Sequence, residues 1–176
     1  MKKLGASGQK MLKILHLIMA GLWIGGAIGL LLMVFALDGA QSGGELHGYD
    51  RARQFVDDWL VIPGAMGCLA TGLLLSWLTP WGFFRHRWVA VKWLLTVACI
   101  IFGTFALGPT TNDQPILSAM YGLGALIDPE YASNRLCNLT GGTVQVAAIV
   151  FMVVISTLKP WKRKAGGTPQ PSGNAG

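Results

Sequence analysis

The sequence predicts an all-α fold, an integral membrane bundle of four transmembrane helices with both termini in the cytoplasm. Hydrophobic residues make up 52% of the chain and charged residues only 12%, about half of the 25% typical of a soluble domain. The apolar residues also gather in four blocks. Each block has about the 20 residues that a helix needs to cross the hydrocarbon core. Polar and charged residues lie between these blocks.

The first two spans are predicted over residues 12–37 and 59–79. The first block is a continuous run of large apolar residues and glycines, interrupted by Lys13 and His16 near its start. In the second block, Pro63 lies about one turn from the start. Because proline lacks a backbone N–H and its ring crowds the preceding turn, we expect a kink there.

The connection that leads into the second span is predicted to be a helix extended beyond the bilayer. Arg53 and Asp57 lie four residues apart in it. On a helix this spacing brings two side chains together, so we expect an exposed ion pair worth about 0.3 kcal/mol. No motif supports a ligand role for these charged residues.

The third and fourth spans are predicted over residues 88–108 and 140–159. Lys92 lies near the start of the third span. Between the two spans, residues 115–127 read PILSAMYGLGALI, which is apolar but too short to cross a bilayer. This pattern is typical of a re-entrant or interfacial helix.

The transmembrane domain, residues 12–159, is flanked by two polar ends. Residues 1–11 form a basic cytoplasmic N-terminus, and residues 160–176, rich in glycine and proline, predict a disordered cytoplasmic tail. An alternative is a secretory signal cleaved after residues 34–36. The apolar run is longer than the 7–15 residues typical of a signal core, which favours a retained span.

The orientation follows from the basic residues. With four crossings, all eight acidic residues lie on one side together with Arg51, Arg53 and Arg135. The remaining lysines and arginines lie on or near the side of both termini. Cytoplasmic loops carry an excess of lysine and arginine, so the sequence predicts cytoplasmic termini in a bacterial inner membrane. Membrane anchoring thus explains the positive net charge, and no nucleic-acid partner is predicted.

Small residues recur four apart in the first two spans. The first carries Gly21, Gly25 and Gly29, and the second carries Gly64, Cys68 and Gly72. Small side chains let helix backbones approach closely in lipid, where packing supplies much of the attraction between helices. We therefore expect these residues to form a tight helix pair or a dimer contact.

A pocket is predicted around His16, Trp23 and Lys92. On a helix His16 and Trp23 share one face, and Lys92 lies at a depth similar to that of His16. Ionisable groups in a membrane usually face the bundle interior or extend to the interface. Both roles stay open, as does a simple hydrogen bond from His16 to a neighbouring helix. No metal site is predicted, because no acidic residue lies in a span and the cysteines lack metal-binding spacing.

The motifs KILHLIMAGLWIGGAIG, WLVIPGAMGCLATGLLLSW and WVAVKWLLTV resemble a family of bacterial predicted integral membrane proteins of unknown function. More distantly, they resemble the copper-resistance D proteins and the HemJ-type protoporphyrinogen oxidases. The HemJ resemblance implies that His16 and Lys92 match a histidine and a lysine associated with haem or porphyrin chemistry. The chain lacks the further histidines of that type.

These observations favour a non-enzymatic binding or partner-interaction module. The partners predicted are the lipid bilayer and either a second copy of the chain or another membrane protein. One alternative is a haem or porphyrin redox protein of HemJ-like type, with His16 as an iron ligand. Another is a permease for a small solute or a metal.

Overall fold

The computed structural model describes residues 4–79 and 87–158, which are helical almost throughout and contain no strand. Helix α1 spans Ala6–Ala36 and is followed by the 3-10 turn η1, Leu37–Gly39. Helix α6 spans Pro129–Leu158. Between them lie two longer helices, each built from several consecutive segments. The predicted all-α bundle of four long apolar helices is therefore confirmed.

The second long helix runs without a break through α2 (Gly43–Val56), η2 (Asp57–Val61) and α3 (Ile62–Leu78). The third runs through α4 (Arg87–Phe102), η3 (Gly103–Leu107) and α5 (Gly108–Tyr121), and closes with the 3-10 turn η4 (Gly122–Ile127). Residues 115–121 thus end the third helix. Residues 115–127 therefore do not form the separate re-entrant helix expected from the sequence, because α5 continues α4 directly. An interfacial position of this segment stays a prediction.

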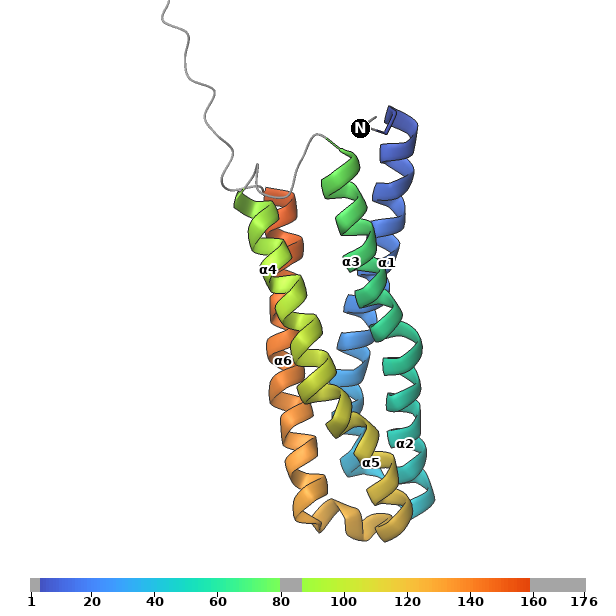
Figure 1. Ribbon diagram of the computed structural model, residues 1–176. Helices are drawn as coiled ribbons and strands as arrows, with labels where there is room; N and C mark the ends of the chain where they lie inside the picture. The colour runs from blue at the N-terminus through green and yellow to red at the C-terminus, as the bar shows by residue number, and fades with distance from the viewer. Residues whose placement is uncertain (1–3, 80–86, 159–176) are drawn as a thin grey trace, which may run out of the picture.

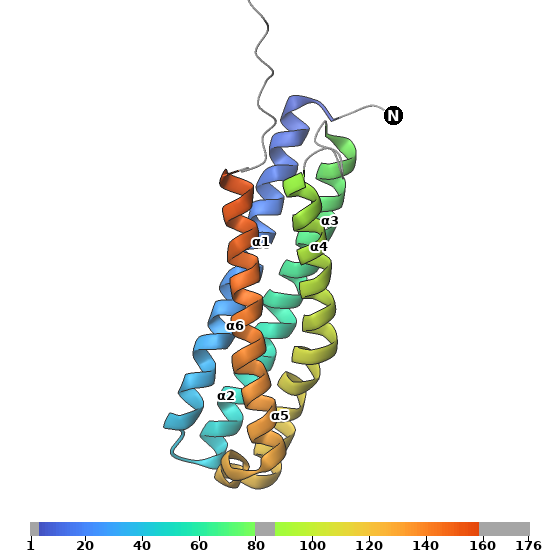
Figure 2. The same ribbon diagram turned by 90° about the vertical axis from the view of Figure 1, so that its left-hand side faces the viewer.

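The four helices run up and down in sequence order (Figure 1). Helix α6 packs against α1 on one side and against α4 and α5 on the other, as Figure 2 shows. Helix α3 packs closely on α1 but only loosely on α4. The two ends of the bundle differ: α1 begins and α6 ends at one, which we call the terminal end, whereas α2, α5 and η4 form the other, the distal end.

Both chain ends in the described residues thus lie at the terminal end (Figure 1). The expected disordered tail, residues 160–176, lies outside the described residues, and so do residues 1–3. The second long helix has 36 residues, or about 54 Å at 1.5 Å per residue. This is longer than a hydrocarbon core of roughly 30 Å, so part of it extends beyond the core.

Side-chain caps define two of the helix starts. Ser42 Oγ accepts a hydrogen bond from the backbone N–H of Glu45, and the Glu45 carboxylate accepts one from the backbone of Gln41. Asp128 Oδ1 accepts from the backbone N–H groups of Glu130 and Tyr131. These contacts satisfy N–H groups that have no partner inside the helix.

Both π-helical turns, η2 and η3, precede a proline by two residues. Val61 ends the first before Pro63, and Leu107 ends the second before Pro109. Proline donates no backbone hydrogen bond and crowds the preceding turn, and a helix relieves such a defect by widening locally. The kink expected at Pro63 takes this form, and the helix changes direction there (Figure 1).

The α1–α3 contact forms where small residues of α3 meet α1. A Cβ placed on Gly64 would lie 2.7 Å from the backbone nitrogen of Trp23, so the two backbones touch. The Cys68 thiol faces the His16 carbonyl at 4.0 Å, and Gly72 faces the His16 ring. On α1, Gly26 lies close to Val61 of η2, directly before α3.

The stripe of Gly21, Gly25 and Gly29 faces away from α3. None of the three has a heavy atom within 4 Å of an added Cβ apart from its own helix. Within one chain, therefore, these glycines do not form the expected helix pair with the second span. The dimer contact stays a prediction.

Two glycine substitutions test this packing, one at the α1–α3 contact and one in the α1 stripe that faces away from α3. We expect Gly64→Ala to destabilise the fold by about 1–3 kcal/mol, because α1 and α3 must move apart. Gly25→Ala should be neutral or stabilising by up to about 1 kcal/mol, since alanine favours a helix. Thermal unfolding midpoints in detergent would measure both, and equal effects would contradict this packing.

Candidate functional site

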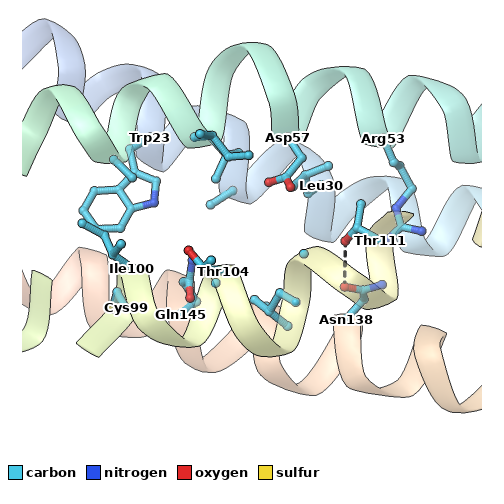
Figure 3. Close-up of a pocket in the computed structure, with 18 of the residues that line it drawn as sticks. Trp23, Leu30, Arg53, Asp57, Cys99, Ile100, Thr104, Thr111, Asn138 and Gln145 are labelled. Carbon is cyan, nitrogen blue, oxygen red and sulfur yellow. Dashed lines mark hydrogen bonds between the residues drawn. The ribbon is translucent and has the colours of Figure 1, made fainter. Parts of the chain in front are cut away.

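A cavity of about 420 Å³ lies between the four helices. This volume is within the range of roughly 300–1,000 Å³ that holds small molecules in proteins. Figure 3 shows the cavity extending from Trp23 at one end to Arg53 and Asn138 at the other. On α1 its lining runs from Trp23 to Val34, or about 16 Å along the helix axis. The cavity is therefore elongated along the bundle.

The π-helical turns contribute to two facing walls. Asp57 and Val61 of η2 line one side, and Gly103, Thr104 and Leu107 of η3 line the other. A π turn widens the helix and shifts the register of its side chains, and such turns are frequent at functional sites. The two proline-linked defects thus lie at one cavity.

Several buried polar atoms at this cavity have no hydrogen-bond partner. These are Trp23 Nε1, Gln145 Oε1 and Arg53 Nε, on side chains that are 3%, 7% and 2% exposed. A buried polar atom without a partner costs about 1–3 kcal/mol. All three residues line the cavity (Figure 3), which makes the cavity the candidate binding site.

A buried polar network closes the distal end of the cavity. Arg53 Nη1 lies 3.6 Å from Asp50 Oδ1 and donates to Gln114 Oε1 at 2.7 Å. The Tyr131 hydroxyl donates to the Asp50 carboxylate at 3.0 Å, and Asn138 Nδ2 donates to Gln114 Oε1 at 2.8 Å. The network thus joins α2, α5 and α6.

Threonines extend this network to the cavity wall. Thr111 Oγ1 and Thr110 Oγ1 each donate to Asn138 Oδ1 at 3.1 Å. Figure 3 shows the Thr111 contact beside Arg53. Asn138 of α6 therefore connects its own helix to α5 at the level where the cavity ends.

The exposed ion pair expected between Arg53 and Asp57 was wrong. Arg53 is 2% exposed and forms its ion pair with Asp50. Its side chain is drawn into the bundle by Gln114 of α5. Asp57 begins the π turn η2, and its carboxylate points into the cavity (Figure 3).

The structure separates the residues of the sequence-predicted pocket. Trp23 lines the cavity, whereas His16 and Lys92 lie closer to the terminal end and are absent from its lining. His16 Nδ1 lies 2.8 Å from Thr71 Oγ1. A cofactor role for these residues stays a prediction.

Haem held by His16 does not fit this cavity, because no histidine lines it. One His16 nitrogen already faces Thr71 across the α1–α3 contact. Within the described residues, no group of three or more histidine, cysteine, aspartate or glutamate side chains could hold a metal ion. A haem bound by His16 would have to lie outside the cavity.

Sequence reasoning missed Gln145, Gln114 and Asn138 as candidates. A signal was present for Gln145, which interrupts the apolar run of the fourth span. Polar side chains within a span usually face the bundle interior. Gln114 and Asn138 lie in the connection between the third and fourth spans, where polar residues are ordinary and carry no such signal.

Four long apolar helices around a buried polar network and a cavity define a multi-pass α-helical membrane protein. The chain belongs to the family described as predicted integral membrane protein (DUF2269), whose model matches residues 10–160. This confirms the family expected from the sequence. The search of curated proteins and the search of solved structures each gave no match. The more distant resemblance to copper-resistance D and HemJ-type proteins stays a prediction.

The buried network predicts unequal effects for two aspartates. We expect Asp50→Ala to destabilise the protein by about 3–5 kcal/mol, because the Arg53 charge stays buried without its partner. Asp38 pairs with Arg135 at the surface and is 66% exposed. Asp38→Ala should therefore cost less than about 1 kcal/mol.

Chemical unfolding in detergent, monitored by circular dichroism, would compare the two variants. A similar loss of stability for both would contradict the assignment of Asp50 and Arg53 as the central buried pair.

Proposed function

We propose that the protein is a non-enzymatic binding module of the bacterial inner membrane, which holds a small lipid-dissolved molecule in the cavity between its helices. One observation carries this proposal: Trp23, Gln145 and Arg53, each with a buried polar atom that has no partner, line a cavity large enough for such a molecule. A bound polar group would supply the missing hydrogen bonds, which are worth about 0.5–1.5 kcal/mol each.

Two lining residues support entry from the bilayer. Ile62 and Met66 of α3 line the cavity and are also 49% and 52% exposed on the bundle surface. They lie on the helix that packs only loosely on α4. A molecule dissolved in lipid can therefore reach the cavity laterally, without crossing the polar network.

Filling the cavity tests this function. Ala65 lines the cavity and is buried, whereas Ala70 on the same helix is exposed. We expect Ala65→Leu to reduce the copurified small molecule several-fold, because the larger side chain occupies its space. Ala70→Leu should leave the amount unchanged.

Mass spectrometry of extracts from protein purified in native-lipid particles would measure this amount per chain. Circular dichroism of both variants controls for folding. Equal amounts in wild type and folded Ala65→Leu would exclude the cavity as the binding site.

The same preparations separate the alternatives. A haem absorption band lost in His16→Ala would favour the haem or porphyrin redox protein, with a site outside the cavity. Solute or metal flux through reconstituted protein, abolished by Ala65→Leu, would favour a permease.

We further propose that the terminal end of the bundle faces the cytoplasm. Lys10 and Lys13 lie in the first turns of α1, and the acids Asp38, Glu45 and Asp50 lie in the distal half. Cytoplasmic segments are enriched in lysine and arginine. The arrangement of charges therefore supports this orientation.

Reporter fusions test the orientation. Fused after residue 176, green fluorescent protein should fluoresce and alkaline phosphatase should be inactive, because both report a cytoplasmic end. An active phosphatase fusion with a dark fluorescent fusion would reverse the orientation.

A further inference from the structure

The charged groups of the cavity do not balance. Among the described residues, Arg53 and Asp57 are the charged side chains in its lining. The Arg53 guanidinium is already engaged, 3.6 Å from the Asp50 carboxylate and hydrogen-bonded to Gln114. When all three groups are ionised, the Asp50 charge offsets that of Arg53, and the negative charge of Asp57 is left over.

Asp57 also lacks a hydrogen-bonding partner. Within the described parts of the chain, no hydrogen bond or ion pair holds its carboxylate. The side chain is partly buried and points into the cavity (Figure 3). A carboxylate drawn out of water is costly unless a cation or several hydrogen-bond donors accompany it.

The opposite wall offers a second free acceptor. Gln145 Oε1 on α6 is buried without a partner and lies across the cavity from Asp57 (Figure 3). An ammonium group carries three donors and one positive charge, so it can satisfy a carboxylate and an amide oxygen together. An anionic head group would instead meet the Asp57 charge, while the Arg53 charge is already offset by Asp50 and only its Nε–H lacks a partner.

We propose that the cavity selects lipophilic ammonium ions, with the R–NH₃⁺ head group between the Asp57 carboxylate and Gln145 Oε1. The apolar tail lies along the cavity against walls such as Leu30 and Ile100. The Trp23 indole N–H remains available for an oxygen atom of the same molecule or a water. This inference rests on the proposed binding function and names the chemical class of its ligand.

Three decyl compounds that differ only in their head group test the selection. Decylammonium, decanol and decyl sulfate would be titrated calorimetrically into the full chain in phosphatidylcholine nanodiscs at pH 7, with empty nanodiscs correcting for partition into lipid. We expect decylammonium to bind at least tenfold more tightly than decanol, and decyl sulfate more weakly than both.

Two adjacent aspartates provide the variant and its control. Asp57→Asn keeps the shape of the side chain and should lower the affinity for decylammonium at least tenfold, with decanol changed less than twofold. Asp58 is exposed and does not line the cavity. Asp58→Asn should therefore keep the preference for the ammonium ion.

The outcomes distinguish a failure of the ammonium selection from a failure of the proposed binding function. If decanol binds as tightly as decylammonium, or Asp57→Asn leaves the preference intact, the ammonium selection is overturned, while binding that is lost in Ala65→Leu still supports the cavity. If no compound binds wild type better than folded Ala65→Leu, the binding function itself fails.

Discussion

The missing backbone N–H groups of Pro63 and Pro109 shape the centre of this bundle. Each proline follows a π turn, and the two turns contribute to facing walls of the same cavity. A regular α-helix in either place would carry its side chains in a different register. The widened turns contribute Asp57 and Thr104 to the lining of the cavity, beside polar residues such as Gln145 of α6.

Buried polar groups are mostly hydrogen-bonded at the distal end of the interior, but several lack partners around the cavity. At the distal end, Asp50 and Arg53 sit in a network in which most groups bond one another across α2, α5 and α6. Around the cavity, the polar atoms of Trp23 and Gln145 have no such partners. Buried polar groups are nearly always paired in folded proteins. Two network atoms, Arg53 Nε and Gln114 Nε2, also lack partners, but most polar groups at the distal end are bonded. This difference supports the proposal that a ligand binds in the cavity.

The four spans were predictable because apolar length is a strong local signal. The distortion at Pro63 was also predictable, because it follows from the missing backbone N–H of proline itself. The interior was harder to predict, because it depends on contacts between residues far apart in the chain. From the sequence Arg53 was expected at the surface. Its burial depends on Gln114, sixty-one positions later in the chain, which the sequence does not place beside it.

The direction in which a glycine faces was equally hidden from the sequence. Gly21, Gly25 and Gly29 have the spacing of a helix-packing motif, yet Gly26 makes the contact with Val61. The helical period places both residue sets on defined faces, but it does not say which face meets a neighbour. In the same way, the face of α1 that carries Trp23 was recognised, whereas the position of the cavity on the distal side of His16 was not.

The distal network has a consequence for biogenesis. Its interhelical bonds join residues of α2 to partners on α5 and α6 that are 61 and 81 positions away. The bond from Arg53 to Gln114 therefore needs the third long helix, and the bond from Tyr131 to Asp50 needs the fourth. Until the fourth helix is in place, Asp50 lacks the Tyr131 hydroxyl and has only Arg53 of its own helix as a partner. The network is therefore complete only when all four helices have come together.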